Sequence, residues 1–201
     1  GKGKSDGKNA NLMDFHTIAH GFDELQTMYG ATGTTGLSPS EVMMDCGASA
    51  SAGGEMAVQN LVAAVAAANP QAQIHIDKNN RPWFRFGDNQ WGQALFQVSV
   101  ILATDFVLEV FALNPGVPMV LLGMNALEQW PVIANFQTGD ALIRGRLVRL
   151  RKTPGKGHCI LDMVEHTRQI LSPTPATSRD IAGKIGEWAL TSSSAETTAP
   201  T

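Results

Sequence analysis

The sequence predicts a mainly β domain with one inserted helix, and three observations support this. Apolar and polar residues alternate over several short runs from Gln73 to Leu113, as is typical of half-buried strands. Two continuous apolar runs, Val42–Met44 and Val117–Leu122, are bounded by turn residues and fit buried strands. Between the first run and the alternating region lies a single Ala-rich helical stretch, residues 55–68.

The compact unit is expected to begin at about Ser40. Residues 1–11 are rich in Gly and Lys and read as a flexible linker. Apolar spacing predicts a helix over Asp14–Tyr29, capped by Asp14, and residues 30–40 form a Gly/Thr/Ser/Pro loop. We therefore assign residues 1–39 to a linker with a short helix.

The first half of the unit combines one strand with one helix. After the strand Val42–Met44, Gly53 and Gly54 are expected to break the chain, and a helix covers Glu55–Ala68 until Asn69-Pro70 ends it. The expected apolar side of this helix comprises Met56, Leu61, Val62 and Val65.

Several strands and a short helix follow. The predicted strands are 74–76, 83–86, 95–100 and 106–113, with turns at 87–89 and 103–105. After the second apolar run we expect a helix over Met124–Trp130, ended by Pro131, and a final hairpin of 132–136 and 141–148 that turns at 138–140. These elements define a unit of residues 40–148.

Residues 149–201 have a different character. A basic run extends from Arg144 to Lys156, a strand or helix is expected around Cys159–Leu171, and a further helix over Ile181–Leu190. The Ser/Thr/Pro-rich tail after it is expected to be disordered.

The most informative motif is a lone carboxylate at the end of a buried strand. Asp45 follows Val42–Met44 and is itself followed by Cys46, Gly47 and Ala48. A strand that ends in this way delivers an acid into a tight loop, where backbone N–H groups can point at the carboxylate.

A second motif completes the pattern: the run 117–122 ends on Gly123, and Leu127 follows four residues later. Together the two motifs resemble the signatures of retropepsins, the aspartic proteases of retroviruses and retrotransposons. Those signatures are apolar-apolar-Asp-(Thr/Ser)-Gly-Ala and apolar-(Ile/Leu)-(Ile/Leu)-Gly-x-x-x-Leu. The resemblance covers roughly residues 40–145, and Cys46 departs from it because the family carries Thr or Ser there.

The resemblance implies a small closed, barrel-like acid-protease fold and peptide hydrolysis by two carboxylates that share one proton. This chain offers one such Asp and is too short for two lobes, so the family pattern implies a homodimer with Asp45 of each subunit on the two-fold axis. The substrate would be an extended peptide or protein segment, in a polyprotein of the retrotransposon type. No metal or organic cofactor is implied.

The family pattern also assigns roles around Asp45. Gly47 would give its backbone N–H to the carboxylate pair, and Ala48 would line the substrate cleft. Leu121, Leu122 and Gly123 would pack beneath the active-site loop. A hairpin would close over the substrate as a flap, comprising Trp83, Phe84, Phe86, Gly87, Asp88, Asn89 and Trp91.

Cys46 raises an alternative function. In retropepsins the hydroxyl at this position bonds across the dimer axis, whereas a thiol is a weak donor with a longer bond. The alternative is a domesticated or decayed protease fold that acts as a structural or protein-binding module. A cysteine nucleophile at Cys46 is disfavoured because Asp45 beside it opposes formation of the thiolate.

Other candidate residues have simpler explanations. His16 and His20 share a helix face but lack the Glu and third ligand of a zinc motif. His158, Cys159 and His166 could meet a metal, but Cys159 lies in an apolar run and is better explained as core. The basic run from Arg144 to Lys156 is typical of a solvated edge, with contact to RNA or an acidic neighbour as its functional interpretation.

Length, net charge and cysteine count narrow the class of protein. The 201 residues allow one ordinary domain plus tails, and the net charge of −3 argues against general nucleic-acid binding by the core domain. Two cysteines do not make a disulfide framework, so we expect a reducing, intracellular location, cytoplasmic or nuclear. No apolar run is long enough to predict a membrane span or a membrane partner.

Overall fold

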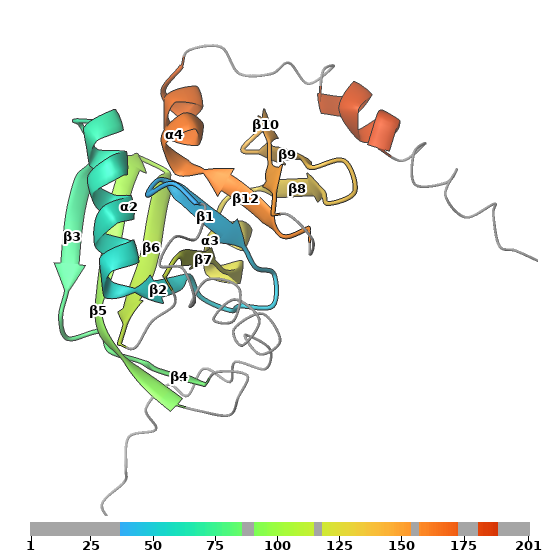
Figure 1. The fold of residues 1–201 in the computed structure, drawn as a ribbon. Helices are drawn as coiled ribbons and strands as arrows, with labels where there is room; N and C mark the ends of the chain where they lie inside the picture. The colour runs from blue at the N-terminus through green and yellow to red at the C-terminus, as the bar shows by residue number, and fades with distance from the viewer. Residues whose placement is uncertain (1–36, 86–90, 115–117, 154–156, 173–180, 189–201) are drawn as a thin grey trace, which may run out of the picture.

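The computed structural model describes residues 37–85, 91–114, 118–153, 157–172 and 181–188. Its architecture is mainly β, as predicted, with two sheets and helices packed against them (Figure 1). The predicted linker and helix within residues 1–36, the turn at 87–89 and the tail after 188 lie outside the described residues.

The larger sheet contains nine strands. In spatial order these are β11 (Arg151–Lys152), β12 (Cys159–Asp162), β1 (Glu41–Met44), β7 (Val120–Leu122), β2 (Ala52–Gly54), β6 (Phe106–Leu113), β5 (Trp91–Ala103) and β3 (Gln73–Asp77), with β4 (Trp83–Arg85) paired to β5. The two end strands, β11 and β3, do not pair with each other in the described part of the chain. The closed barrel expected from the family resemblance is therefore wrong, and the sheet is open.

A smaller sheet lies beside it, with the order β10 (Arg146–Arg149), β9 (Asp140–Ile143) and β8 (Val132–Asn135). The predicted single strand over 141–148 is wrong, because the chain turns at Arg144 and Gly145. Both residues have positive φ values, 53° and 73°, which no strand residue adopts.

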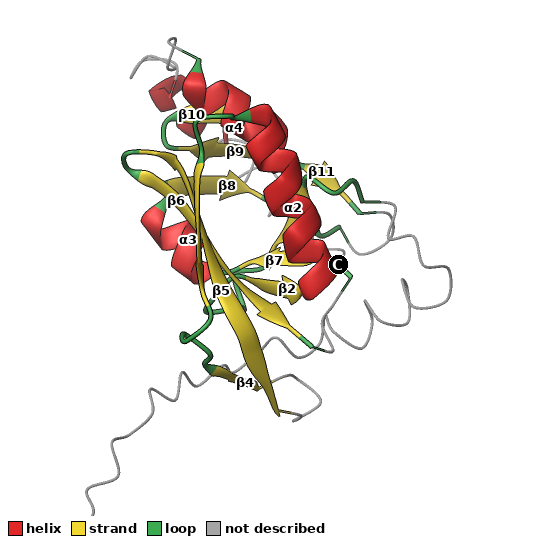
Figure 2. Ribbon diagram, turned by 90° about the vertical axis from the view of Figure 1, so that its left-hand side faces the viewer, coloured by secondary structure: helices red, strands yellow, loops and turns green. Residues whose placement is uncertain are grey.

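Three labelled helices pack on these sheets: α2 (Glu55–Ala68), α3 (Met124–Gln129) and α4 (Met163–Leu171). The predicted bounds of α2 are confirmed, and Leu61 and Val65 are buried as expected. Met56 is not on the buried side, since 66% of it is exposed, and Val58 takes that place. The apolar side of α2 packs on β2, β6 and β7, and Figure 2 shows the helix beside the sheet.

The expected chain break at Gly53–Gly54 is also wrong, because these residues belong to β2. This strand lies between β7 and β6, with Gly53 opposite both Val120 and Ala112. A Cβ atom on Gly53 would lie 2.7 Å from the carbonyl oxygen of Met119. The glycine therefore marks close backbone packing rather than a turn.

The segment after residue 148 shares the sheet and core of the first unit. β12 pairs antiparallel with β1, Leu161 and Met163 are buried in the main core, and α4 packs beside α2. The alternatives of strand or helix for 159–171 are both present, as β12 followed by α4. Residues 181–188 are helical and place Ile181 against Gly145.

Candidate functional site

Asp45 lies immediately after β1, in the loop that the sequence predicts. Its carboxylate oxygen Oδ1 accepts a hydrogen bond from the Gly47 backbone N–H at 2.8 Å, which confirms the expected geometry. Its own N–H donates to the carbonyl of Leu122 at 3.0 Å, and its carbonyl accepts from Ala48 at 3.2 Å. Asp45 is half-buried. The bond to Leu122 joins the first residue of its loop to the second motif.

The second motif pairs with β1 and then contacts both ends of the Asp45 loop. β7 runs parallel to β1, with Met43 opposite Leu121 and Met44 opposite Leu122. At the end of β7 the chain crosses the loop, and the N–H of Met124 donates to the Ala48 carbonyl at 2.7 Å. The predicted contact between the two motifs is confirmed.

Gly123 allows this crossing. A Cβ atom there would lie 2.5 Å from the carbonyl carbon of Ala50 and 2.8 Å from the Ala48 carbonyl oxygen. No side chain fits between two backbones at that distance. The glycine of the second motif is thus explained by close backbone approach.

Ser51 and Asn125 form a lock that the sequence analysis missed. The Asn125 side-chain carbonyl accepts from both the N–H and the hydroxyl of Ser51, at 2.7 and 2.8 Å. The Ser51 Oγ in turn accepts from the Gly123 N–H at 3.1 Å. An amide residue two positions after the glycine that ends an apolar run was the available signal.

The rest of the Asp45 loop divides into a buried and an exposed side. Ala48 is fully buried and packs with Leu121 and Phe84 in one apolar cluster, whereas Cys46 is exposed and its thiol is free. The loop therefore presents Asp45 and Cys46 outward, over an apolar floor.

The β4–β5 ribbon is the hairpin expected as a flap. Trp83 lies opposite Gln93 and Arg85 opposite Trp91, so the two strands pair as predicted. Phe84 is buried and packs edge-on against Phe111, with ring centroids 5.3 Å apart. The remaining flap candidates, Phe86, Gly87, Asp88 and Asn89, lie outside the described residues.

The alternative metal site does not assemble. Within the described ranges no group of three or more His, Cys, Asp or Glu side chains is placed to hold a metal ion. Cys159 is buried in the core, and burial raises the pKa of its thiol. His16 and His20 lie outside the described residues.

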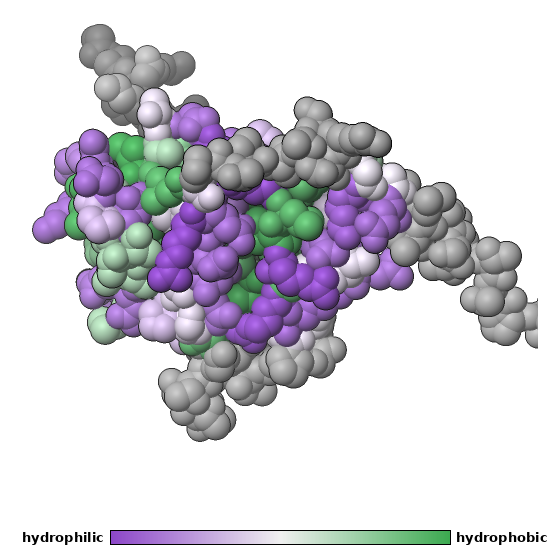
Figure 3. Space-filling model, turned by 90° about the horizontal axis from the view of Figure 1, so that it is seen from above, coloured by the Kyte–Doolittle hydropathy of each residue, from purple (hydrophilic) through white to green (hydrophobic). Residues whose placement is uncertain are grey.

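Much of the basic run is paired on the surface. Arg149 contacts Asp140 at 2.7 Å and Arg151 contacts Glu41 at 2.8 Å, which agrees with a solvated edge. Seen from above, hydrophilic side chains cover most of this face and surround smaller hydrophobic patches (Figure 3). No described helix is both long and apolar enough to span a membrane.

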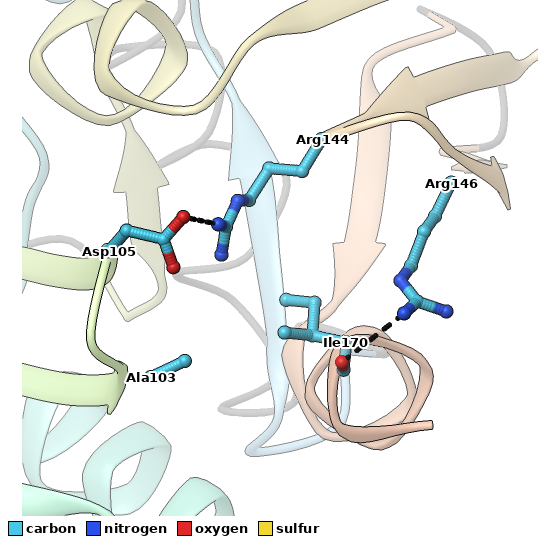
Figure 4. A pocket seen from close by; sticks show the side chains of 5 residues that line it. All are labelled: Ala103, Asp105, Arg144, Arg146 and Ile170. Carbon is cyan, nitrogen blue, oxygen red and sulfur yellow. Dashed lines mark hydrogen bonds and ion pairs between the residues drawn. The ribbon is translucent and has the colours of Figure 1, made fainter. Parts of the chain in front are cut away.

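A cavity of about 230 Å³ lies between the turn that joins β5 to β6, the turn that joins β9 to β10, and α4 (Figure 4). It is lined by Ala103, Asp105, Arg144, Arg146 and Ile170. Arg144 pairs with Asp105, which lowers the pKa of that carboxyl mainly through their hydrogen bond, and Arg146 donates to the Ile170 carbonyl at 3.4 Å. Because both arginines already have these partners, we assign the cavity no ligand.

Comparisons with known proteins give no match for this chain, whether to family models, to curated proteins or to solved structures.

Proposed function

We propose that the chain is an aspartic endopeptidase that works as a homodimer, with Asp45 of each subunit as the catalytic carboxylate. The observation that carries the proposal is the hydrogen bond from the Gly47 N–H to Asp45, in a loop crossed by Gly123 and locked by Ser51 and Asn125. A bond of the same kind is present in the turn at Asp77, so the crossing by Gly123, the lock and the sequence resemblance to retropepsins are what favour a carboxylate held for chemistry.

The chemistry requires a second carboxylate. Two close carboxyl groups share one proton, so that one activates a water molecule while the other polarises the scissile carbonyl. The Asp45 loop supplies one carboxylate, and its outward side carries the exposed Cys46. A second copy approaching this side would supply the other carboxylate, and the site would be complete only in the dimer.

The proposed substrate is an extended peptide, and polyprotein processing is the proposed role. Such a segment would lie between the Asp45 loop and the β4–β5 ribbon, bonded through its backbone as an added strand. Phe84 and Ala48 are fully buried in one apolar cluster, so they would support this space from beneath, and Ala48 does not line a cleft in the single chain as the family pattern implied.

The second candidate is a non-catalytic protein-binding module that retains the protease fold. Cys46 favours it, because a thiol braces the dimer axis less well than the Thr or Ser hydroxyl of the family. Both candidate functions are compatible with the geometry of the Asp45 loop, but only the protease would hydrolyse peptides.

The deciding experiment compares Asp45→Asn with a matched variant, Asp77→Asn. Asp77 also accepts a backbone N–H two residues on, that of Asn79 at 2.8 Å, but lies on the far edge strand β3. In a peptide-hydrolysis assay at mildly acidic pH, Asp45→Asn should abolish turnover and Asp77→Asn should retain it. Activity per chain should also fall on dilution through the dimer dissociation constant. Equal activity of wild type and Asp45→Asn would refute the proposal.

A second variant separates enzyme from module. Cys46→Thr should tighten the dimer by about fivefold or more, since two neutral hydrogen bonds form across the axis. It should also raise hydrolysis if the protein is a working protease. If neither the wild type nor Cys46→Thr hydrolyses any peptide, the non-catalytic protein-binding module is the better explanation. If Cys46→Thr abolishes hydrolysis while Asp45→Asn retains it, the chemistry is cysteine-based.

A further inference from the structure

β3 forms one end of the larger sheet, with β5 on one side and no strand on the other in the described part of the chain (Figure 1). Its five residues, Gln73–Asp77, pair with residues 97–101 of β5 without a bulge. In a strand that is paired on one side only, the backbone N–H and C=O groups of alternate residues point away from the neighbour. β3 therefore presents a short, regular row of backbone donors and acceptors at the end of the sheet.

The two ends of the larger sheet differ in chemistry. β11, at the other end, consists only of Arg151 and Lys152, and charged side chains on a very short edge strand oppose pairing with another chain. β3 is longer, contains no Lys, Arg or Pro, and carries its one carboxylate, Asp77, at its last position. The β3 edge thus lacks the features that protect the β11 edge.

Part of the apolar core face is open to solvent on β3. Ile74 lies opposite Val100 and Ile76 opposite Val98, and directly opposite residues share one face of a sheet. Both valines are buried in the main core, whereas Ile74 and Ile76 are 44% and 53% exposed. The core face therefore continues onto β3, where about half of each isoleucine is uncovered.

The sequence of β3 is complementary to itself when two copies run antiparallel. A two-fold axis through His75 places Ile74 opposite Ile76 of the second copy, and Gln73 opposite Asp77 of the second copy. Each isoleucine then gains an apolar neighbour on its own face. A shift of one residue would instead place Ile74 opposite Asp77 and Ile76 opposite His75, so the pattern favours a single register.

The polar groups also match in this register. Asp77 already accepts the Asn79 and Asn80 N–H groups through Oδ1, and its Oδ2 has no partner within the described ranges, so it can accept from the Gln73 amide of the second copy. Residues 71–80 contain one carboxylate, Asp77, and one ammonium group, Lys78. At neutral pH the edge of each copy therefore carries no net charge, and two copies do not repel each other there.

We propose that the β3 edge is a self-association surface, at which a second copy of this chain adds its own β3 as an antiparallel strand with the two-fold axis at His75. An exposed sheet edge accepts an added strand through main-chain hydrogen bonds. The matching of Ile74 with Ile76 and of Gln73 with Asp77 is a property of two identical strands, and it favours a second copy over a different protein.

This surface is separate from the proposed catalytic dimer. Four strands, β7, β2, β6 and β5, lie between β3 and the strand β1 that leads into Asp45. The proposal therefore does not depend on proteolysis. Two strands of five residues bury little area, so the association should be weak and require high protein concentration. If both surfaces are occupied, each copy contacts two others and assemblies larger than dimers form.

The test cross-links cysteine variants of the full chain with a bismaleimide that spans about 8 Å, enough for opposite residues but not for residues four positions apart. The background is Cys46→Ser, in which Cys159 stays buried. His75→Cys should give cross-linked dimers, because the two thiols meet at the axis. A mixture of Gln73→Cys and Asp77→Cys should cross-link, but each variant alone should not, because its two copies lie about 13 Å apart along the strands.

Matched variants separate the β3 edge from other contacts. Ile76→Lys, added to His75→Cys, should lower the cross-linked fraction by about tenfold or more, because it places a charge in the apolar part of the pairing. Ile133→Lys introduces the same charge at a similarly exposed isoleucine on the smaller sheet and should leave cross-linking unchanged. Glu128→Cys, exposed on α3, measures cross-linking by random collision. Circular dichroism of each variant verifies that it is folded.

Three outcomes would overturn the proposal. The first is cross-linking of His75→Cys that is no faster than that of Glu128→Cys, and binding of an unrelated strand-forming peptide to the edge would then assign it to a different partner. The second is cross-linking that folded Ile76→Lys does not reduce. The third is efficient cross-linking of Gln73→Cys alone, which would mean that the strands pair in parallel and not about an axis at His75.

Discussion

Ser51 and His166 are both fully buried polar side chains, but their surroundings differ completely. Ser51 donates to Asn125 and accepts from Gly123, so each of its polar groups is used. His166, on α4, packs edge-on to Phe106 at 5.6 Å and near Trp130. Among the described residues neither of its ring nitrogens has a hydrogen-bond partner.

The difference shows which part of the fold should lose stability when the pH changes. A satisfied polar network in a low-dielectric interior fixes one arrangement, here the crossing of the two motifs. A buried imidazole without partners must stay neutral, because its protonated form would need solvation that the core does not supply. The network of Ser51, Asn125 and the Gly123 N–H contains no titratable group, so we expect this network to be insensitive to pH and the α4 region to be sensitive to it.

The largest loss of stability should come from Gly123→Ala, because this change disrupts the place where the second motif crosses the Asp45 loop. The new Cβ would meet the backbone of Ala50 at 2.5 Å, and backbone cannot rotate away as a side chain can. Overpacking typically costs about 1–3 kcal/mol, and we expect about 3 kcal/mol or more here. Urea denaturation measures this change in the free energy of unfolding.

Gly183→Ala is the matched control for that variant. A Cβ on Gly183 meets nothing within 4 Å, and the residue lies in the helical segment 181–188. Alanine favours helices over glycine, so this variant should be neutral or gain up to about 1 kcal/mol. Equal losses in the two variants would contradict the packing argument at Gly123.

The second prediction concerns acid. Burial, followed by the charges of Arg144 and Arg146, lowers the pKa of His166 to about 4 from its ordinary value of 6.5. Between these two pH values the unfolded chain binds a proton that the folded chain does not. Folding stability should therefore fall as the pH drops from 6.5 to 4, by up to about 3 kcal/mol from this residue.

His166→Leu tests the assignment, because leucine has a similar size and no proton to bind. Thermal unfolding at a series of pH values measures the stability of this variant. Its stability should fall much less between pH 6.5 and 4 than that of the wild type. An unchanged decline would place the acid sensitivity elsewhere. Since aspartic proteases work in mild acid, His166 would also set the lower pH limit of the proposed activity.

Ser51→Ala should have a smaller effect, about 1–3 kcal/mol. It leaves the Gly123 N–H without its acceptor in a buried site and removes one of the donors to Asn125. The free energy of unfolding should fall while the pH dependence stays that of the wild type. A changed pH profile would mean that the two regions are coupled.

The smallest effect should come from Arg151→Gln. Arg151 donates from Nε and a terminal nitrogen to the two carboxylate oxygens of Glu41, at 2.9 and 2.8 Å, but its side chain is 45% exposed. Solvent screens such pairs, and we expect a loss of about 1 kcal/mol or less that shrinks in high salt. Chemical denaturation with and without added salt would measure it.

Local sequence patterns predicted the elements that surround Asp45. The buried strand, the tight loop, the helix over Glu55–Ala68 and the contact with Leu121–Gly123 follow from apolar runs, turn residues and glycines. These features depend on neighbours in the sequence, or on a family pattern that names both motifs.

Features that depend on distant partners could not be predicted in the same way. Gly53 reads as a chain break until Met119 is known to lie against it. Arg144 reads as a strand residue until its φ of 53° places it in a turn. His166 reads as a candidate ligand until Phe106 and Trp130 enclose it.

One pairing has a consequence for how the protein is made. β1 lies between β7 and β12, so the strand that leads into Asp45 obtains its last neighbour from residues 159–162. On a translating ribosome this edge of β1 stays open until synthesis has passed Asp162. Under the proposed function, the nascent chain would therefore remain without proteolytic activity until the sequence well beyond both motifs has emerged.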